Sequence, residues 1–327
     1  MSIILGQLFS LLVCREGMCG LCGSGASLRE LPATAIEGTV VGMTFLAGGV
    51  QLTTATGDAA ANVAKMERLG RSLKEKNPQL ALLAFPELAL TGYSAGAGFY
   101  ELAEPWPDGT HLSRLAGLAR ELGVVLVVGY AEASSARGLI YDSAAVFDYD
   151  GRPVASCRKT HCLDSERQFF ANGDQLSLIA TSLGVLGVMI CWDAAFPEVA
   201  RTLALEGADL LVTIGAWEDP YVGDWELVAA ARAYDNVIPV VAVNRTGADG
   251  DVQFSGHSCI VDCLGHPVPK LGDEQDGLLV GTVDFDKTRE VRAGYGSQLR
   301  DRRPELYAAV SAPATALSGS PSPPERE

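Results

Sequence analysis

Three residues with reactive side chains, Glu87, Lys159 and Cys191, each come directly after a segment whose pattern predicts a β-strand. The carboxyl ends of strands are where the sites of α/β proteins form. A carboxylate there suits a general base, and a thiol suits a nucleophile. A lysine beside a cysteine would stabilise a thiolate and a developing oxyanion. The three residues are therefore candidates for one catalytic site.

Each of these residues also has an ordinary explanation when it is taken alone. Cys191 lies between the apolar segment 185–190 and the helical segment 196–205, so helix N-terminal amides would lower the pKa of its thiol and hold an oxyanion. A free cysteine is, however, commonly inert and buried. Glu87 alone would be a surface carboxylate and Lys159 a solvated lysine, so only their combination indicates a site.

The segments that must position these residues alternate between strands and helices. Apolar and alternating patterns predict strands at residues 45–52, 80–85, 124–131, 139–149, 154–158, 184–190, 210–214, 237–243, 258–262 and 278–283. Helical spacing predicts helices at residues 59–76 (with Asp58 as the cap), 112–122, 196–206, 225–236 and 304–310. Asp150-Gly151 predicts a hairpin turn, and Gly265 another turn. We interpret the chain as one domain with two layers of strands between helices.

Composition narrows the function classes. The 327 residues are 48% hydrophobic and carry a formal net charge of −15. A surface this acidic repels nucleic acids and anionic membranes, so a small-molecule substrate is expected. A chain of this length does not depend on disulfides, so most of its eight cysteines are expected to be reduced in a cytoplasmic protein.

The two ends of the chain differ from its body. Residues 1–42 have an apolar start without the preceding positive charge of a secretory signal, and the run is too short to span a bilayer. We expect an N-terminal extension that is poorly ordered, with Met43 as a possible true start. Residues 43–310 are predicted to form the domain, and residues 311–327, rich in Pro, Ser and Ala, a disordered tail.

The local sequences around the three candidate residues resemble motifs of the nitrilase superfamily of carbon–nitrogen hydrolases. Residues 84–93 resemble that family's glutamate motif, 158–174 its lysine motif and 191–198 its cysteine motif. Further similarities occur at residues 231–236, 244–245, 256–258 and 302–307, so the resemblance covers roughly residues 43–307.

This resemblance implies an α/β fold, a four-layer α-β-β-α sandwich, usually paired in homodimers. It implies that Glu87 takes the proton of Cys191, that the thiolate attacks the substrate carbon, and that Lys159 and the backbone N–H of Trp192 hold the oxyanion. Glu166 matches a second glutamate that positions the lysine and the substrate, although a purely structural role is equally open. No metal or organic cofactor is implied.

The residues after the cysteine bear on the substrate. Nitrilases of the family tend to have Cys-Trp-Glu, whereas this chain has Cys191-Trp192-Asp193, which resembles the amidase and N-carbamoyl-amine branches. We therefore expect an amide or ureide, with a nitrile as the alternative. Tyr93, Trp192 and Trp217 are candidates for the pocket wall, and ordinary packing is the competing explanation for Trp217.

Acidic residues close to Trp217 add a weaker indication about the substrate. Glu218, Asp219 and Asp224 would favour a cationic substrate such as a polyamine derivative.

Three alternatives remain. Residues 92–96 match the G-x-S-x-G pattern, so Ser94 with His257 or His266 would make a serine hydrolase, although no strand directly precedes the serine. Metal binding would need the cysteines and histidines at 157–162, 257–263 or 14–22, none of which has a paired zinc spacing. The third alternative is a catalytically inactive binding module on the same fold.

Overall fold

Two β-sheets pack against each other between pairs of helices in the part of the chain that the computed structural model describes, residues 44–273 and 275–312. The predicted extension at residues 1–42 and residues 313–327 of the predicted tail lie outside these described residues. The expectations about both ends, including Met43 as a start, therefore stay predictions.

The first sheet has seven strands in the order β15-β1-β2-β4-β5-β6, with β3 paired to β4. Strands β1, β2 and β4 run parallel, whereas β15, β5 and β6 add antiparallel pairs. The bounds are β1 (Thr44–Gln51), β2 (Leu80–Ala84), β3 (Glu104–Pro105), β4 (Val125–Ala133), β5 (Ile140–Phe147), β6 (Pro153–Arg158) and β15 (Gly277–Asp284).

The second sheet has six strands in the order β14-β13-β10-β9-β8-β7, with β8, β9 and β10 parallel. A separate hairpin joins β11 and β12. The bounds are β7 (Leu178–Thr181), β8 (Gly184–Ile190), β9 (Leu210–Gly215), β10 (Val240–Asn244), β11 (Thr246–Asp249), β12 (Val252–Ser255), β13 (Cys259–Val261) and β14 (Pro267–Lys270).

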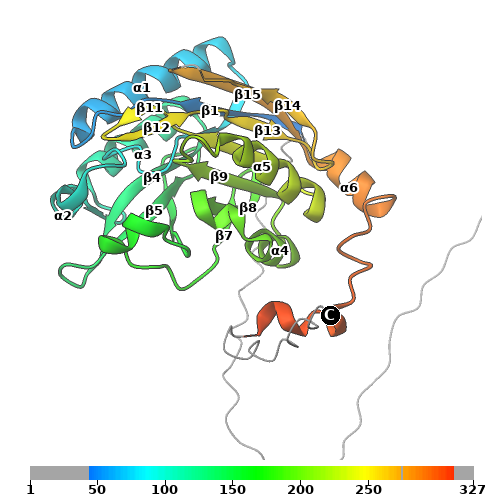
Figure 1. Ribbon diagram of the computed structural model, residues 1–327. Helices are drawn as coiled ribbons and strands as arrows, with labels where there is room; N and C mark the ends of the chain where they lie inside the picture. The colour runs from blue at the N-terminus through cyan, green and yellow to red at the C-terminus, as the bar shows by residue number, and fades with distance from the viewer. Residues whose placement is uncertain (1–43, 274, 313–327) are drawn as a thin grey trace, which may run out of the picture. The chain divides into compact units, whose positions relative to one another are not determined.

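Helices cover the outer face of each sheet. Helices α1 (Ala59–Lys76) and α3 (Thr110–Leu122) share one apolar cluster with the first sheet, and α4 (Pro197–Leu205) and α5 (Val222–Asn236) pack on the second. In Figure 1, α1 lies along β1 and β15, while α4 and α5 lie next to β8 and β9. A further apolar layer joins the two sheets, so the order is α-β-β-α and the predicted fold class is confirmed.

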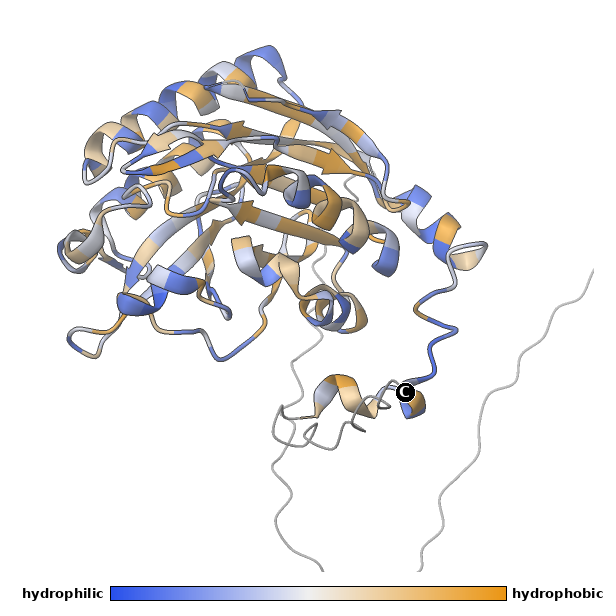
Figure 2. Ribbon diagram, in the orientation of Figure 1, coloured by the Kyte–Doolittle hydropathy of each residue, from blue (hydrophilic) through white to orange (hydrophobic). Residues whose placement is uncertain are grey.

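Strand β1 of the first sheet packs directly against β10 of the second. A Cβ atom at Gly49 would lie 2.5 Å from Cγ2 of Val243, which is nearer than any real Cβ contact. Figure 2 shows the strands of both sheets mainly in hydrophobic colours, whereas α1 alternates between hydrophilic and hydrophobic residues. The inner layer is thus apolar and tightly packed, which holds the ends of its strands in fixed positions.

Most predicted elements are present with bounds close to those expected. In α1, for example, Asp58 accepts a hydrogen bond from the backbone N–H of Ala61 at 2.9 Å. Val63, Met66 and Leu73 are buried on its inner face. The cap and the spacing that predicted this helix are therefore the features that form it.

Other predictions were wrong or incomplete. Residues 304–310 form two short 3₁₀ turns instead of one helix, and the C-terminal helix is α6 (Phe285–Ala293), which Asp284 caps. The strand expected at 237–243 begins only at Val240, because Val237 adopts a left-handed conformation that ends α5. Unpredicted elements are β3, β7, β11, β12, β14 and the short helix α2 (Phe99–Leu102). These elements are short or poor in apolar residues.

Within the described part of the chain, none of the helices combines the length and the apolar character needed to cross a lipid bilayer.

Candidate active site

Lys159 lies at the centre of a buried group of carboxylates. Its Nζ donates to Oε1 of Glu87 at 2.6 Å, and to Oε1 and Oε2 of Glu166 at 2.8 and 2.7 Å. Burial alone would lower the pKa of this ammonium, but the negative charges of Glu87 and Glu166 raise it well above its usual value. The lysine therefore stays charged and bridges the two glutamates.

Glu87 is fixed from both sides of its carboxylate. It follows β2 and is buried, and its Oε2 accepts a hydrogen bond of 2.7 Å from the backbone N–H of Ala216, just past β9. The next residue, Leu88, has a φ of 48°, which turns the chain sharply away. This turn passes against Gly129 of β4, where a Cβ would lie 2.4 Å from the carbonyl oxygen of Pro86. Because Gly129 has no side chain, the loop that carries Glu87 can pass this close to β4.

Cys191 follows β8 and begins a 3₁₀ turn with a φ of 47°. A left-handed conformation at a residue other than glycine costs about 1–3 kcal/mol and is typical of functional sites. Helix α4 begins only at Pro197, so the thiol does not sit directly at a helix N-terminus as expected.

The expected lowering of the pKa of the Cys191 thiol was wrong. Burial raises this pKa well above its usual value, and the charge of Glu87 raises it further. Lys159 and the backbone N–H of Ala216 lower it, but not enough to compensate. The resting thiol is therefore protonated near neutral pH, and a base is needed to activate it.

Glu166 holds several groups at once. Besides the two contacts with Lys159, it accepts hydrogen bonds from the hydroxyl of Tyr93 at 2.6 Å and from the backbone N–H of Leu163 at 2.7 Å. The backbone N–H of Tyr93 in turn donates to Asp249 at 2.7 Å. Glu166 thus contacts both the lysine and its own loop, so positioning of Lys159 and the substrate and structural support of the loop both stay predictions.

A cavity of about 440 Å³ opens beside Cys191. The three predicted pocket residues, Tyr93, Trp192 and Trp217, all line it. The rings of Trp192 and Trp217 lie 5.7 Å apart, and Asn244 accepts a hydrogen bond from the backbone N–H of Trp217 at 2.7 Å. The volume and the aromatic walls suit a small organic molecule.

Acidic side chains also line this cavity. They are Asp164, Glu218 and Asp224, whereas Asp219 is not among the lining residues. Asp219 instead accepts a hydrogen bond from Ser255. Two of the three acidic residues predicted near the pocket, and one that was missed, therefore line the cavity.

The described residues do not place a histidine beside Ser94, as the serine hydrolase alternative requires. The hydroxyl of Ser94 donates to the backbone carbonyl of Asp249 at 2.8 Å. His257 pairs with Glu226 at 2.5 Å, and His266 is exposed next to Asp262. No histidine contact supports activation of Ser94 among the hydrogen bonds of the described residues.

The cysteine and histidine groups considered for metal binding have other partners. His161 pairs with Asp193 at 2.8 Å, and burial raises the pKa of the Cys157, Cys162 and Cys259 thiols to about 12. Among the described residues, one group has the spacing to hold a metal ion, formed by Glu87, Asp142 and Glu166. Their oxygens lie within 4.8 Å of one another, but these carboxylates already surround the Lys159 ammonium. Cys14, Cys19 and Cys22 lie outside the described residues.

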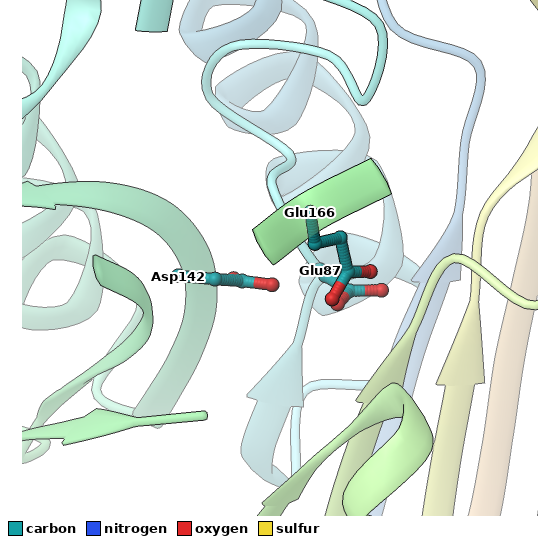
Figure 3. A group of neighbouring side chains, drawn as sticks. All are labelled: Glu87, Asp142 and Glu166. Atoms are coloured by element: carbon teal, nitrogen blue, oxygen red, sulfur yellow. The ribbon is translucent and has the colours of Figure 1, made fainter. Parts of the chain in front are cut away.

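Besides Asp164, sequence reasoning missed Asp142, which lies among the buried carboxylates. It lies in β5, is completely buried, and points toward Glu87 and Glu166 (Figure 3). Its signal in the sequence was an isolated acidic residue within an apolar strand pattern. Such a residue is costly to bury, so its presence there indicates other polar or charged groups nearby.

Comparisons with known proteins agree with this fold and show the family. The carbon-nitrogen hydrolase family model matches residues 46–293. A probable nitrilase of Schizosaccharomyces pombe is 40% identical, over 81% of this chain and 97% of its own. An N-carbamoylputrescine amidase of Solanum lycopersicum is 36% identical, over 77% and 90%. The chain belongs to the carbon–nitrogen hydrolase family, within the nitrilase superfamily, and is a hydrolase of carbon–nitrogen bonds.

A solved structure extends the comparison to a reacted site. A mutant amidase from Nesterenkonia sp. AN1 matches with a TM-score of 0.70 and 27% identity, over 80% of this chain and 95% of its own. That structure shows covalent addition of the acetamide moiety of fluoroacetamide at the active site cysteine.

Proposed function

We propose that this enzyme hydrolyses a small amide or N-carbamoyl amine through a thioester on Cys191. The observation that carries the proposal is the buried Lys159 bridge between Glu87 and Glu166, next to the Cys191 thiol, whose pKa is raised by burial. A protonated nucleophile needs a base, and a fixed cation suits the oxyanion that forms when the thiol attacks.

The proposed reaction has two halves. Glu87 takes the proton of Cys191, the sulfur attacks the substrate carbon, and Lys159 with the backbone N–H of Trp192 stabilises the negative oxygen. The carbon–nitrogen bond then breaks, and Glu87 gives its proton to the leaving ammonia or amine. In the second half, Glu87 takes a proton from water, the hydroxide attacks the thioester carbon, and the thiol is regenerated with that proton.

The experiment measures ammonia or amine release from a panel of small amides, N-carbamoyl amines and nitriles. Wild type is compared with Cys191→Ala, and with Cys259→Ala as a matched control, because Cys259 is also a buried thiol but does not line the cavity. Turnover by wild type and by Cys259→Ala, with none by Cys191→Ala, is expected. Equal turnover by all three proteins would remove Cys191 from the mechanism.

The panel also decides between substrate branches. The relatives include proteins named as nitrilases and as N-carbamoylputrescine amidases, so a nitrile remains the second candidate. We favour an N-carbamoyl amine that carries a positive charge, because Asp164, Glu218 and Asp224 line the cavity. Glu218→Gln should then raise KM for a cationic substrate and leave KM for a neutral amide of the same length unchanged.

The oligomeric state, the domain boundary and the cellular location of the protein are also proposals. We propose a homodimer, which sedimentation velocity would measure, and a domain that ends near residue 310. Cytoplasmic location also stays a prediction.

A further inference from the structure

The carboxyl group of Asp142 is unusual among the buried acids of this site. Its side chain is completely buried, and no hydrogen-bond donor among the described residues reaches either of its oxygens. The nearest cation, Nζ of Lys159, is 3.6 Å away, beyond hydrogen-bond distance. Figure 3 shows the side chain pointing at the carboxyl groups of Glu87 and Glu166.

The two glutamates differ from Asp142 in their donors. Glu87 accepts from Lys159 and from the backbone N–H of Ala216. Glu166 accepts from Lys159, from the hydroxyl of Tyr93 and from a backbone N–H. A buried carboxylate is stable as an anion only when donors replace its water. The glutamates meet this condition, and Asp142 does not.

The charges of the cluster point the same way. Three ionised carboxylates around the single ammonium of Lys159 would leave two uncompensated negative charges in a buried site. A proton on one carboxyl group removes one of these charges. It also turns that group into a donor, which an acid facing another carboxylate needs.

We infer that Asp142 is a protonated carboxyl group in the working enzyme and that its O–H donates to the carboxylate of Glu87. Asp142 is then a positioning residue, because it acts on the substrate only through Glu87. This inference rests on the proposed function of Glu87 as the base. It leaves the N–H groups of Lys159 to the two glutamates, whereas an ionised Asp142 would compete for them.

The electrostatic surroundings support the neutral form. Burial raises the pKa of Asp142 well above its usual range, and the charge of Glu87 raises it further, while Lys159 lowers it. Glu166 also raises it, and the thiol of Cys162 is a titratable group that interacts with Asp142.

The first test is isotope-edited infrared spectroscopy of the full-length wild type, without substrate. A protonated carboxyl group gives a C=O band that is separate from the carboxylate bands and shifts in deuterated water. We expect such a band to move when aspartate is labelled with carbon-13 and to disappear in Asp142→Asn. No such band, or a band that moves only with labelled glutamate, would overturn the inference.

The second test compares two substitutions. Asn is neutral and can donate from its amide group to Glu87. Asp142→Asn should therefore keep kcat within about tenfold of wild type, because the hydrogen bond to Glu87 changes in strength but is not lost. Ala cannot donate, so Asp142→Ala should lower kcat about 100-fold with a smaller change in KM, because the base is misplaced. Equal losses in both variants would contradict a neutral Asp142.

The two tests separate this inference from the proposed function. The infrared band needs no turnover, and it should persist in Cys191→Ala. If wild type proves inactive on every substrate while the band is present, only the proposed function fails. If turnover depends on Cys191 and the band is absent, only the inference fails.

Discussion

The carboxylate of Asp193 binds the segment that carries Lys159. It accepts hydrogen bonds from the hydroxyl of Thr160 at 2.7 Å and from the backbone N–H of the same residue at 3.1 Å. The backbone N–H and the ring of His161 donate to it as well, at 2.9 and 2.8 Å. Because Thr160 follows Lys159 and Asp193 lies two residues beyond Cys191, this carboxylate ties the lysine and cysteine segments together.

Asp193→Asn should therefore impair the enzyme although Asp193 is not proposed to react. The substitution places an NH₂ group, which is itself a donor, next to the N–H and O–H donors of Thr160 and His161. The segment that carries Lys159 and the segment that carries Cys191 should then move slightly apart. We expect kcat to fall about 10–100-fold, because small displacements of reacting groups have effects of this size. Steady-state kinetics measures this loss. Asp235→Asn, on an exposed side chain of α5, is the control, and an equal loss there would contradict the explanation.

Gly129→Ala should displace the glutamate loop. The added methyl group would meet the backbone at Pro86 and Glu87, at 2.4 and 2.5 Å, and backbone atoms cannot move aside cheaply. We expect a loss of about 1–3 kcal/mol in the free energy of unfolding, together with reduced kcat. Gly117→Ala is the matched control, because α3 has open space there and alanine favours a helix. Chemical denaturation should show opposite signs for the two variants.

Glu87→Gln should lower the pKa of the Cys191 thiol. The negative charge of Glu87 is, after burial, the largest cause of the raised pKa, so removing the charge favours the thiolate. We therefore expect the thiolate to form at a lower pH than in wild type. Ultraviolet titration, with Cys191→Ala as the baseline, measures this shift. Glu218→Gln should leave the titration unchanged, and a rise in the pKa of the Glu87→Gln variant would refute the argument.

Tyr93→Phe should remove a hydrogen bond that positions Glu166, while the aromatic ring that lines the cavity is retained. The variant keeps the ring that lines the cavity and loses the 2.6 Å hydrogen bond to the carboxylate. Hydrogen bonds to charged groups contribute about 1.5–3 kcal/mol, so kcat/KM should fall roughly 10-fold to 100-fold. Tyr221→Phe is the control, because Tyr221 lines the same cavity with an exposed side chain. A variant of Tyr93 as active as wild type would show that this contact is dispensable.

Sequence reasoning located the site because its signals are local. Glu87 and Cys191 each end an apolar strand, and the chain turns at both points as the patterns predict. Lys159 was placed by the hairpin before it, since the Asp150-Gly151 turn fixes how β5 and β6 pair. The pairing register of the strands then brings Glu87, Lys159 and Cys191 to the same end of the two sheets.

The electrostatics of the site could not be predicted in the same way. The pKa of the Cys191 thiol depends on Glu87, which lies more than 100 positions earlier and reaches the thiol from the other sheet. Asp142 was missed for a similar reason, because the charged groups that surround it come from other segments. Short elements such as β14 were missed because their residues are mostly exposed or partly exposed, so no apolar pattern marks them.

The close contact between Gly49 and Val243 has a consequence for catalysis at a distance. Glu87 and Lys159 extend from the first sheet, whereas Cys191 extends from the second, so the thickness of the apolar layer sets how far the base stands from the sulfur. A single methyl group at position 49 would thicken that layer. Gly49 thus contributes to the reaction through the side chain it lacks, although it carries no group that touches the substrate.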